Sequence, residues 1–395
     1  MPSENSSQAA LAEDWQNGGF AIYLHWPFCQ AKCPYCDFNS HVARQIDQTR
    51  WLDAYLRELD RYAALTPGRV LTSVFFGGGT PSLMDPAVVH GVLDRIRQLW
   101  PRANDLEVTL EANPGSVEAG RFKAYAQAGV NRISMGIQAL DDRDLSRLGR
   151  IHTVAEAMAA FEVARAQFDR VSFDLIYARQ DQTLDAWQTE LKQALAMAVD
   201  HLSLYQLTIE DGTAFGDRYA RGKLKGLPAD DLSADMYQMT QDLCEDAGFL
   251  TYEVSNHARI GAESRHNRVY WRYGDYIGIG PGAHGRLTLN GQRLATEAIS
   301  NPGRWLDKVA TAATEKERSL LTAEDQASEF LMMGLRLAEG IDPERYHRLA
   351  GRALSPDRLA HLAELGMIEV GPTAIKATRQ GRMVLNAILS ELLVD

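Results

Sequence analysis

Three cysteines lie close together near the start of the chain, Cys29, Cys33 and Cys36, with three and then two residues between them. Thiolates are the protein ligands of iron–sulfur clusters, and three of them can hold three irons of a four-iron cluster. The remaining cysteine, Cys244, is far along the chain. The spacing therefore predicts a [4Fe–4S] cluster whose fourth iron is open to a small molecule.

A structural zinc site is the main alternative for these cysteines. Zinc takes four protein ligands and usually draws on closely spaced cysteine pairs. His25 or His41 could complete the set, although the spacing would be unusual. Buried thiols without any metal are the other alternative.

A glycine-rich segment, Gly77, Gly78, Gly79, Thr80 and Pro81, directly follows a predicted strand. Three consecutive glycines expose the backbone and let a ligand approach it closely. A tight turn between a strand and a helix is the simpler interpretation, since a glycine-rich loop alone is a weak signal.

Four further polar residues, Glu111, Gln138, Arg150 and Asp174, lie at or beyond the ends of predicted strands. Taken singly, each could be a helix cap or a solvated loop residue. Asp174 is different because it lies inside the apolar run VSFDLIY, where a carboxylate needs a partner or a ligand.

Strands and helices alternate at least six times, which is typical of right-handed βαβ units and a parallel sheet. Six units are too few to close an eight-stranded barrel, so we expect an α/β fold with an open, three-quarter (β/α)6 barrel. The polar residues fall after successive strands, where parallel barrels carry their active sites. The predicted strands cover 21–25, 70–76, 106–112, 132–138, 171–177 and 201–207, and the helices 48–65, 86–100, 117–128, 153–168, 184–198 and 229–247.

The pattern changes near residue 301, so we expect three parts: a flexible arm over 1–19, the barrel domain over 20–300, and a carboxyl-terminal domain over 301–395. Helical patterns over 320–338, 343–350 and 356–365 precede a short hairpin over 366–377 and a last helix over 379–393. This order predicts a winged-helix-like α+β module. It has no basic recognition face, which favours a packing or substrate-covering role.

Composition excludes several function classes. The formal net charge of −11 argues against non-specific nucleic-acid binding, which needs clustered Lys and Arg. Residues 1–19 lack the basic start and apolar core of a signal peptide, and no run approaches the roughly 18 apolar residues of a membrane span. Thiolates kept for a cluster fit a reducing compartment, so we expect a cytoplasmic protein.

The cysteine loop, with Tyr35 just before its last cysteine, resembles the cluster loop of radical S-adenosylmethionine (SAM) enzymes. GGGTP, LEANP, SMGIQ, LGRIH, FDLIY and RHNRVYW then follow in the order seen in one family of these proteins. That family contains oxygen-independent coproporphyrinogen III dehydrogenase and a related heme chaperone. The resemblance covers about residues 20–390.

The resemblance implies a [4Fe–4S] cluster held by Cys29, Cys33 and Cys36, with SAM chelated at the open iron and cleaved by one electron to a 5'-deoxyadenosyl radical. A carboxylate would suit the ribose hydroxyls, an arginine the SAM carboxylate and an aromatic ring the adenine. The residues implied to surround SAM are Tyr23, Tyr35, Gly78, Gly79, Thr80, Glu111, Gln138, Arg150 and Asp174.

Two departures count against the dehydrogenase branch. That branch has a fourth cysteine two residues after the last cluster ligand, where this chain has Phe38, and it has a longer amino-terminal arm. The chaperone branch carries an HNxxYW motif, and this chain has it as His266, Asn267, Tyr270 and Trp271. The resemblance implies that these four residues bind heme.

Histidine is a common axial ligand of heme iron, and aromatic side chains could line the flat ring. For the motif alone, a surface histidine beside a packed aromatic pair is the simpler interpretation. His257 and His284 are rival ligands.

We therefore expect a heme chaperone whose cofactors are a [4Fe–4S] cluster, SAM and heme. Its implied partners are a recipient hemoprotein, such as a respiratory one, and an electron donor for the cluster, with a homodimer as one arrangement. The alternative is the dehydrogenase itself, which would decarboxylate coproporphyrinogen III, so the sequence leaves open whether the protein is an enzyme. Radical modification of protein or RNA is a third class, and no basic surface supports it.

Overall fold

The computed structural model describes residues 13–43 and 45–393. Its main sheet contains six consecutive parallel strands in chain order, each followed by helical crossovers, as the sequence predicts. The strands are β1 (Phe20–Trp26), β4 (Leu71–Gly78), β5 (Arg102–Ala112), β6 (Arg132–Gln138), β7 (Arg170–Tyr177) and β8 (His201–Gln206). The sheet does not close, because β14 (Ser319–Leu320) and β9 (Leu250–Glu253) form its two edges.

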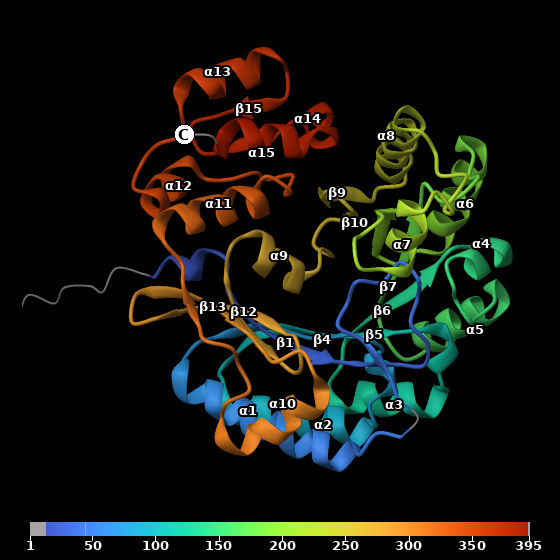
Figure 1. Cartoon of the computed structure of the whole chain (residues 1–395), viewed down its shortest axis with the longest axis vertical. Coiled ribbons are helices and arrows are strands. Elements are labelled where there is room, and N and C mark those ends of the chain that lie inside the picture. The colour runs from blue at the N-terminus through green and yellow to red at the C-terminus, as the bar shows by residue number, and fades with distance from the viewer. Residues whose placement is uncertain (1–12, 44, 394–395) are drawn as a thin grey trace, which may run out of the picture.

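Helices cover the outer face of this open barrel, and Figure 1 shows α1, α2 and α3 along it. In α1 the buried residues Trp51, Tyr55, Leu59 and Tyr62 recur at helical spacing and face the core. The covering helices are α1 (Gln48–Leu65), α2 (Pro86–Leu99), α3 (Ala119–Ala128), α5 (Val154–Arg165), α6 (Leu184–Met197) and α8 (Asp230–Asp246). Within the described ranges, no helix is long and apolar enough to cross a membrane.

A short helix, α9 (Arg265–Trp271), packs on β4, β1 and β11. It lies on the opposite side of the sheet from α1 and α2 (Figure 1). The side chain of Ser73 on β4 faces α9, whereas its neighbour Val74 lies in the core on the other side. Helix α9 therefore packs against the concave side of the barrel.

Further strands extend the sheet at both edges, and most of them were not predicted. β11 pairs parallel with β1, and the other added strands are antiparallel to their neighbours. β12 and β13 are joined by Asn290 and Gly291, which both have positive φ, as a two-residue hairpin turn requires. The added strands are β9 (Leu250–Glu253), β10 (Asn256–Ala258), β11 (Asp275–Ile279), β12 (His284–Leu289), β13 (Gln292–Glu297) and β14 (Ser319–Leu320).

The carboxyl-terminal module has its own core, which includes Phe330, Leu331, Tyr346 and Ile388. The predicted last helix is two helices, because the backbone leaves the helical conformation at Val384. The elements are α11 (Ala323–Gly334), α12 (Pro343–Ala350), α13 (Pro356–Glu364), β15 (Ile368–Val370), β16 (Ile375–Ala377), α14 (Arg379–Met383) and α15 (Leu385–Leu393).

The boundary of this module lies about twenty residues after the predicted one at 301. α10 (Pro302–Lys308) belongs to the barrel core, where Trp305 stacks on Trp51 with ring centroids 5.5 Å apart. β14 still pairs with β13. The barrel domain therefore extends to about Leu320.

The predicted flexible arm needs correction for residues 13–19, while residues 1–12 lie outside the described part of the chain. Trp15 is buried, and the Arg69 guanidinium stacks over its ring at 4.4 Å. Asp14 forms an ion pair with Arg345 of α12 at 2.8 Å. Aromatic burial and this ion pair hold the segment between the barrel and the module.

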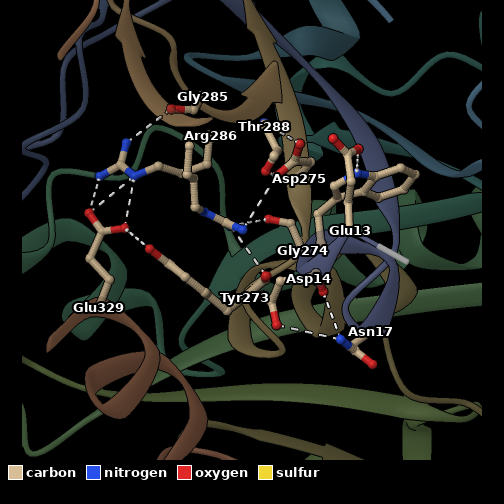
Figure 2. A network of polar contacts seen from close by, with 12 residues as sticks. Glu13, Asp14, Asn17, Tyr273, Gly274, Asp275, Gly285, Arg286, Thr288 and Glu329 are labelled. Carbon is tan, nitrogen blue, oxygen red and sulfur yellow. Dashed lines mark hydrogen bonds and ion pairs between the residues drawn. The ribbon is translucent and has the colours of Figure 1, made fainter. Parts of the chain in front are cut away.

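Figure 2 shows the polar joint between the extended sheet and the module. Arg286 of β12 pairs with Glu329 of α11 at 2.7 Å, and Tyr273 donates to the same carboxylate at 2.9 Å. Arg293 donates to the Tyr273 and Gly274 carbonyls, at 3.2 and 2.8 Å. These bonds fix the orientation of β11 and β12 relative to α11.

Candidate functional site

The three clustered cysteines line one cavity at the carboxyl end of the parallel strands. They lie in the loop that follows β1, where the short strand β2 (Phe28–Cys29) pairs with β3 (His41–Val42). All three thiols are half-buried, whereas Cys244 lies on α8 with its side chain fully buried in the core. The structure therefore brings together the three predicted ligands and leaves the fourth cysteine apart.

The donor set does not fit a single zinc ion. Among the described residues, no three His, Cys, Asp or Glu side chains form a group that could hold one metal ion. Both ring nitrogens of His25, a proposed fourth ligand, already have partners. Nδ1 lies 3.0 Å from the Tyr23 hydroxyl, and Nε2 lies 2.9 Å from the Asn39 carbonyl oxygen. Three thiols that line a cavity without converging on one point suit a cluster, in which each binds a different iron.

Two donors reach the cysteine sulfurs. Thr80 Oγ1 lies 3.5 Å from Cys29 Sγ, and Arg150 Nη1 lies 3.4 Å from Cys33 Sγ. Burial raises the pKa of Cys29, and the Thr80 hydroxyl partly offsets this effect. Burial likewise raises the pKa of Cys36. The guanidinium and the hydroxyl are therefore placed to stabilise thiolates in a site that otherwise disfavours negative charge.

Arg150 joins three elements of the site. Besides Cys33, its Nη2 donates to Asn113 Oδ1 at 2.5 Å and to the Gly136 carbonyl at 2.8 Å. Asn113 Nδ2 in turn donates to Thr80 Oγ1 at 2.8 Å. The arginine is held by neutral acceptors, so its charge remains available to an anionic ligand.

The glycine segment lies against the wall of the cavity. The Gly78 amide donates to Glu111 Oε2 at 3.2 Å, and its φ of 109° suits only glycine. A Cβ at Gly78 would lie 2.6 Å from the His25 ring, and one at Gly79 would lie 2.6 Å from the Phe28 carbonyl oxygen. Close approach of the backbone therefore explains both residues.

Two carboxylates, Glu111 and Asp174, line the same cavity. Burial, followed by the charge of Asp174, raises the pKa of Glu111 to about 8. Burial raises the pKa of Asp174 to about 6, partly offset by the Ser203 hydroxyl and Arg132. Both side chains are half-buried. Two carboxylates in one cavity, whose charged forms are disfavoured by desolvation, favour a positively charged ligand between them.

Gln138 and Tyr35 complete the predicted set around the cavity. Gln138 ends β6 with a φ of 78°, a conformation that is rare for a residue with a side chain and costs free energy. The pairing of β6 with β7 shifts register between Met135 and Gln138. This strained strand end directs Gln138 into the site.

Tyr23 is the predicted SAM residue that does not line the cavity. It lies in the middle of β1 rather than at its end, and its hydroxyl is 3.0 Å from His25 Nδ1. Its ring stacks against Phe75 at 6.2 Å, inside the barrel. Its effect on a ligand would therefore be indirect, through His25 and the strand.

The HNxxYW residues do not line the cavity either, because they lie on α9 inside the barrel. His266 is 1% exposed and stacks on Phe75 with centroids 4.9 Å apart. Its Nδ1 lies 3.0 Å from Ser73 Oγ, and its Nε2 lies 2.7 Å from the Tyr270 hydroxyl. Burial lowers its pKa to about 3, so the ring is neutral, with both nitrogens engaged.

The other motif residues have separate partners. Asn267 Nδ2 donates to the Tyr252 hydroxyl at 3.3 Å, and Arg336 of the module stacks over the Trp271 ring at 4.5 Å. The Tyr270 ring contacts Tyr276 at 4.4 Å. In this structure the motif holds α9 to the barrel and to the module, and it offers no open axial ligand.

Several cavity residues were not predicted. Asn113 follows β5 inside the quoted LEANP motif, and Ser134 and Gly136 precede Gln138 on β6. Residues two apart on a strand share a face, so alternation back from Gln138 could have identified Ser134 and Gly136. Phe38 also lines the cavity, although it is 57% exposed.

Two family models match parts of this chain. A family model described as the Radical SAM superfamily matches residues 23–193, and one described as the HemN C-terminal domain matches residues 321–384. The fold resembles a solved structure described as "Coproporphyrinogen III oxidase (HemN) from Escherichia coli is a Radical SAM enzyme", with a TM-score of 0.78 and 23% identity over 95% of this chain and 90% of that chain.

The chain is also similar to the protein named "Heme chaperone HemW" of Escherichia coli, with 38% identity over 95% of this chain and 98% of that protein. It is 37% identical to "Radical S-adenosyl methionine domain-containing protein 1, mitochondrial" of Bos taurus, over 94% of this chain and 87% of that protein. The chain belongs to the HemW family of radical SAM proteins. Membership of the superfamily implies a [4Fe–4S] cluster and SAM as cofactors.

Proposed function

We propose that the protein is a heme chaperone, which holds a [4Fe–4S] cluster and SAM, binds heme and delivers it to a recipient hemoprotein. The observation that carries this proposal is near full-length similarity to proteins named as heme chaperones, from 33% to 38% identical in four bacteria. The cavity that collects the cysteines, the glycine segment and the two carboxylates supports the cofactors.

Cys29, Cys33 and Cys36 would hold the cluster, and Arg150 and Thr80 would stabilise its thiolate ligands through the contacts described above. When bound, the cluster supplies one electron that can cleave SAM to a 5'-deoxyadenosyl radical. The pocket would recognise SAM by charge: Glu111 and Asp174 suit its cationic groups and ribose hydroxyls, and Arg150 suits its carboxylate. Gly78, Gly79, Thr80, Gln138 and Tyr35 would shape the remaining wall.

Heme binding at His266, Asn267, Tyr270 and Trp271 stays a prediction. An axial bond to His266 would require its ring to give up the contact with Ser73 or with Tyr270. It would also require α9 to move away from β4, because His266 is buried against Phe75. Heme binding through this motif therefore presupposes an opened barrel.

The recipient is proposed to be a hemoprotein such as a respiratory one, and the cluster would need an electron donor. A homodimer also stays a prediction. We propose the cytoplasm as the place of action, since clustered thiolates need a reducing compartment.

Anaerobic reconstitution followed by two parallel assays tests the function. Hemin is titrated into the cluster-loaded protein, and the Soret band is followed. The same preparation receives coproporphyrinogen III, SAM and a reductant, and products are separated by chromatography. The proposal expects heme binding and no decarboxylated product. Protoporphyrinogen formed over many turnovers would overturn it in favour of the dehydrogenase.

A further inference from the structure

An axial ligand to heme must be a side chain that the porphyrin can reach. Of the ten histidines, five are buried, namely His25, His152, His201, His257 and His266. His41 on β3 is half-buried, with its Nε2 3.2 Å from Asn39 Oδ1. The exposed histidines are His90 on α2, His347 on α12, His361 on α13 and His284 on β12. The first three of these lie on helices that cover the barrel or form the module, away from the cysteine loop.

His284 differs because it is the first residue of β12, at the rim where β1 and β11 end. It lies two residues before Arg286, which pairs with Tyr276 of β11, so alternation places both side chains on the same face of the sheet. Gly280, four residues before His284, lies so close to β1 that a Cβ there would clash with the His25 carbonyl oxygen. His284 is thus an exposed residue on a strand that begins beside the end of β1.

The segment that precedes His284 is docked on the cysteine loop. Asn39 Nδ2 donates to the Pro281 carbonyl at 2.9 Å and to the Ser300 carbonyl at 2.8 Å. Gly282 has a φ of 76°, and a Cβ there would lie 2.6 Å from Asn39 Nδ2. The His25 imidazole in turn contacts the Asn39 carbonyl. The cysteine loop therefore sets the position of the turn that carries His284.

The cysteine loop also offers the other groups that heme needs. Phe38 is 57% exposed and lines the cluster cavity, and Val42 is 59% exposed. Lys32 is exposed and close enough to His41 to lower its pKa, after burial. Lys32 forms no ion pair with any described residue. An apolar ring, an imidazole and an unpaired cation suit the flat face, the iron and the propionates of heme.

We propose that His284 is the axial ligand to heme iron, at the rim of the barrel and just after the turn that Asn39 of the cysteine loop holds. The proposal rests on the heme-chaperone function proposed above and names its ligand. It differs from ligation by His266, since His284 needs no opening of the barrel. It also explains how the cluster could control heme binding: the loop that holds the cluster holds Asn39, and Asn39 holds the turn before His284.

Hemin titration into the cluster-loaded protein tests the ligand, with the Soret band and the electron paramagnetic resonance of ferric heme as readouts. His284→Ala should weaken binding by about tenfold or more and change both spectra. His284→Cys should bind heme with a Soret band typical of thiolate ligation, which a merely structural residue would not produce. His347→Ala, which also removes an exposed histidine, should match the wild type.

The outcomes distinguish an error in the proposed function from an error in the assignment of His284 as the ligand. A wild type that binds no heme overturns the proposed function itself. A wild type that binds heme, with His284→Ala and His284→Cys giving unchanged spectra and affinity, overturns only the assignment of His284. Cluster content and circular dichroism of every variant show that these differences do not come from misfolding.

Asn39→Ala provides a second test of the same geometry. It removes two bonds to the turn and leaves the imidazole of His284 in place. Heme affinity should fall less than in His284→Ala, with the Soret position unchanged. A heme affinity equal to that of the wild type would show that the cysteine loop does not position the ligand.

Discussion

The rim of the barrel and its interior are both rich in polar side chains, but they differ in how these groups are satisfied. At the rim, Glu111 and Asp174 are half-buried carboxylates with raised pKa values, and Gln138 is held in a left-handed conformation. In the interior, His266 has a partner at each ring nitrogen. Incomplete compensation and strain mark a ligand site, whereas satisfied bonds mark a structural one.

The difference changes how the two motifs are understood. The cysteine loop and the HNxxYW motif are equally visible in the sequence, yet the first surrounds a cavity and the second holds α9 in the barrel. Variants at the rim should therefore weaken cofactor binding and change the free energy of unfolding little. Variants in the interior should lower the free energy of unfolding and change cofactor binding little.

The largest expected effect is at the cysteines. Cys29→Ala, Cys33→Ala or Cys36→Ala should each abolish a stable four-iron cluster, because each removes one of three protein ligands. Iron and sulfide analysis after anaerobic reconstitution measures this. Cys244→Ala is the control and should retain the cluster, since that thiol lies in the core. A full cluster in the Cys33 variant would show that the ligand assignment is wrong.

The next effect concerns SAM. Arg150→Gln and Asp174→Asn each remove a charge from the pocket, and the loss of a charge-assisted hydrogen bond costs about 1.5–3 kcal/mol. SAM affinity should fall by roughly one to two orders of magnitude. Calorimetry on cluster-loaded protein gives the values, with Arg143→Gln on the nearby α4 (Asp142–Arg147) as an exposed control. Unchanged affinity in both pocket variants would place SAM elsewhere.

Stability should depend on pH through the two carboxyl groups. The pKa of Glu111 rises from 4.5 to about 8 on folding, and that of Asp174 from 3.8 to about 6. At a pH between the ordinary and the raised pKa of each group, the folded protein keeps a proton that the unfolded chain has released. The free energy of unfolding therefore falls as pH rises from about 4 to about 8. Urea unfolding of the cluster-free protein at several pH values should show this trend, and Glu111→Gln should reduce it. An equal slope in the variant would mean that other groups cause the dependence.

Much of the barrel could be predicted because its signals are local. The strand over 132–138 and the helix over 48–65 have the predicted limits, and the six strand–helix units follow in the predicted order. The extension of the sheet beyond β1 was missed because glycines such as Gly278 in β11 and Gly285 in β12 interrupt its alternation. Asn290 and Gly291 between alternating apolar residues were a signal for the hairpin that could have been used.

Most of the cavity was also predictable, since parallel strands bring their carboxyl ends together. Tyr23 was not, because a position in the middle of a strand does not reach the rim. The environment of His266 could be predicted only in part. Its partner Tyr270 lies four residues further along the same helix, a spacing that brings two side chains together. Its partner Ser73 depends on how α9 packs across the barrel, and no local pattern specifies that packing.

A smaller effect is expected in the barrel interior. His266→Ala removes the stack on Phe75 and leaves two buried hydroxyl groups without their partner. The free energy of unfolding should fall by about 2–4 kcal/mol, measured by urea denaturation. His90→Ala, at an exposed position of α2, should change it by about 0.5 kcal/mol or less. Cluster content should stay normal in both variants, and loss of the cluster in His266→Ala would contradict the separation of the two regions.

The smallest effect, and the sharpest test of the comparison, is Tyr270→Phe. This change removes only the hydroxyl that lies 2.7 Å from His266 Nε2 and leaves the ring in contact with Tyr276. One buried ring nitrogen then lacks a partner, so the free energy of unfolding should fall by about 1–2 kcal/mol. If the motif is structural, as the packing of α9 indicates, the Soret band of bound heme should not change. If His266 ligates heme, loss of the hydroxyl frees Nε2, so heme affinity should rise and the Soret band should shift. Removal of this one hydroxyl group therefore distinguishes a structural role of the motif from heme ligation by His266.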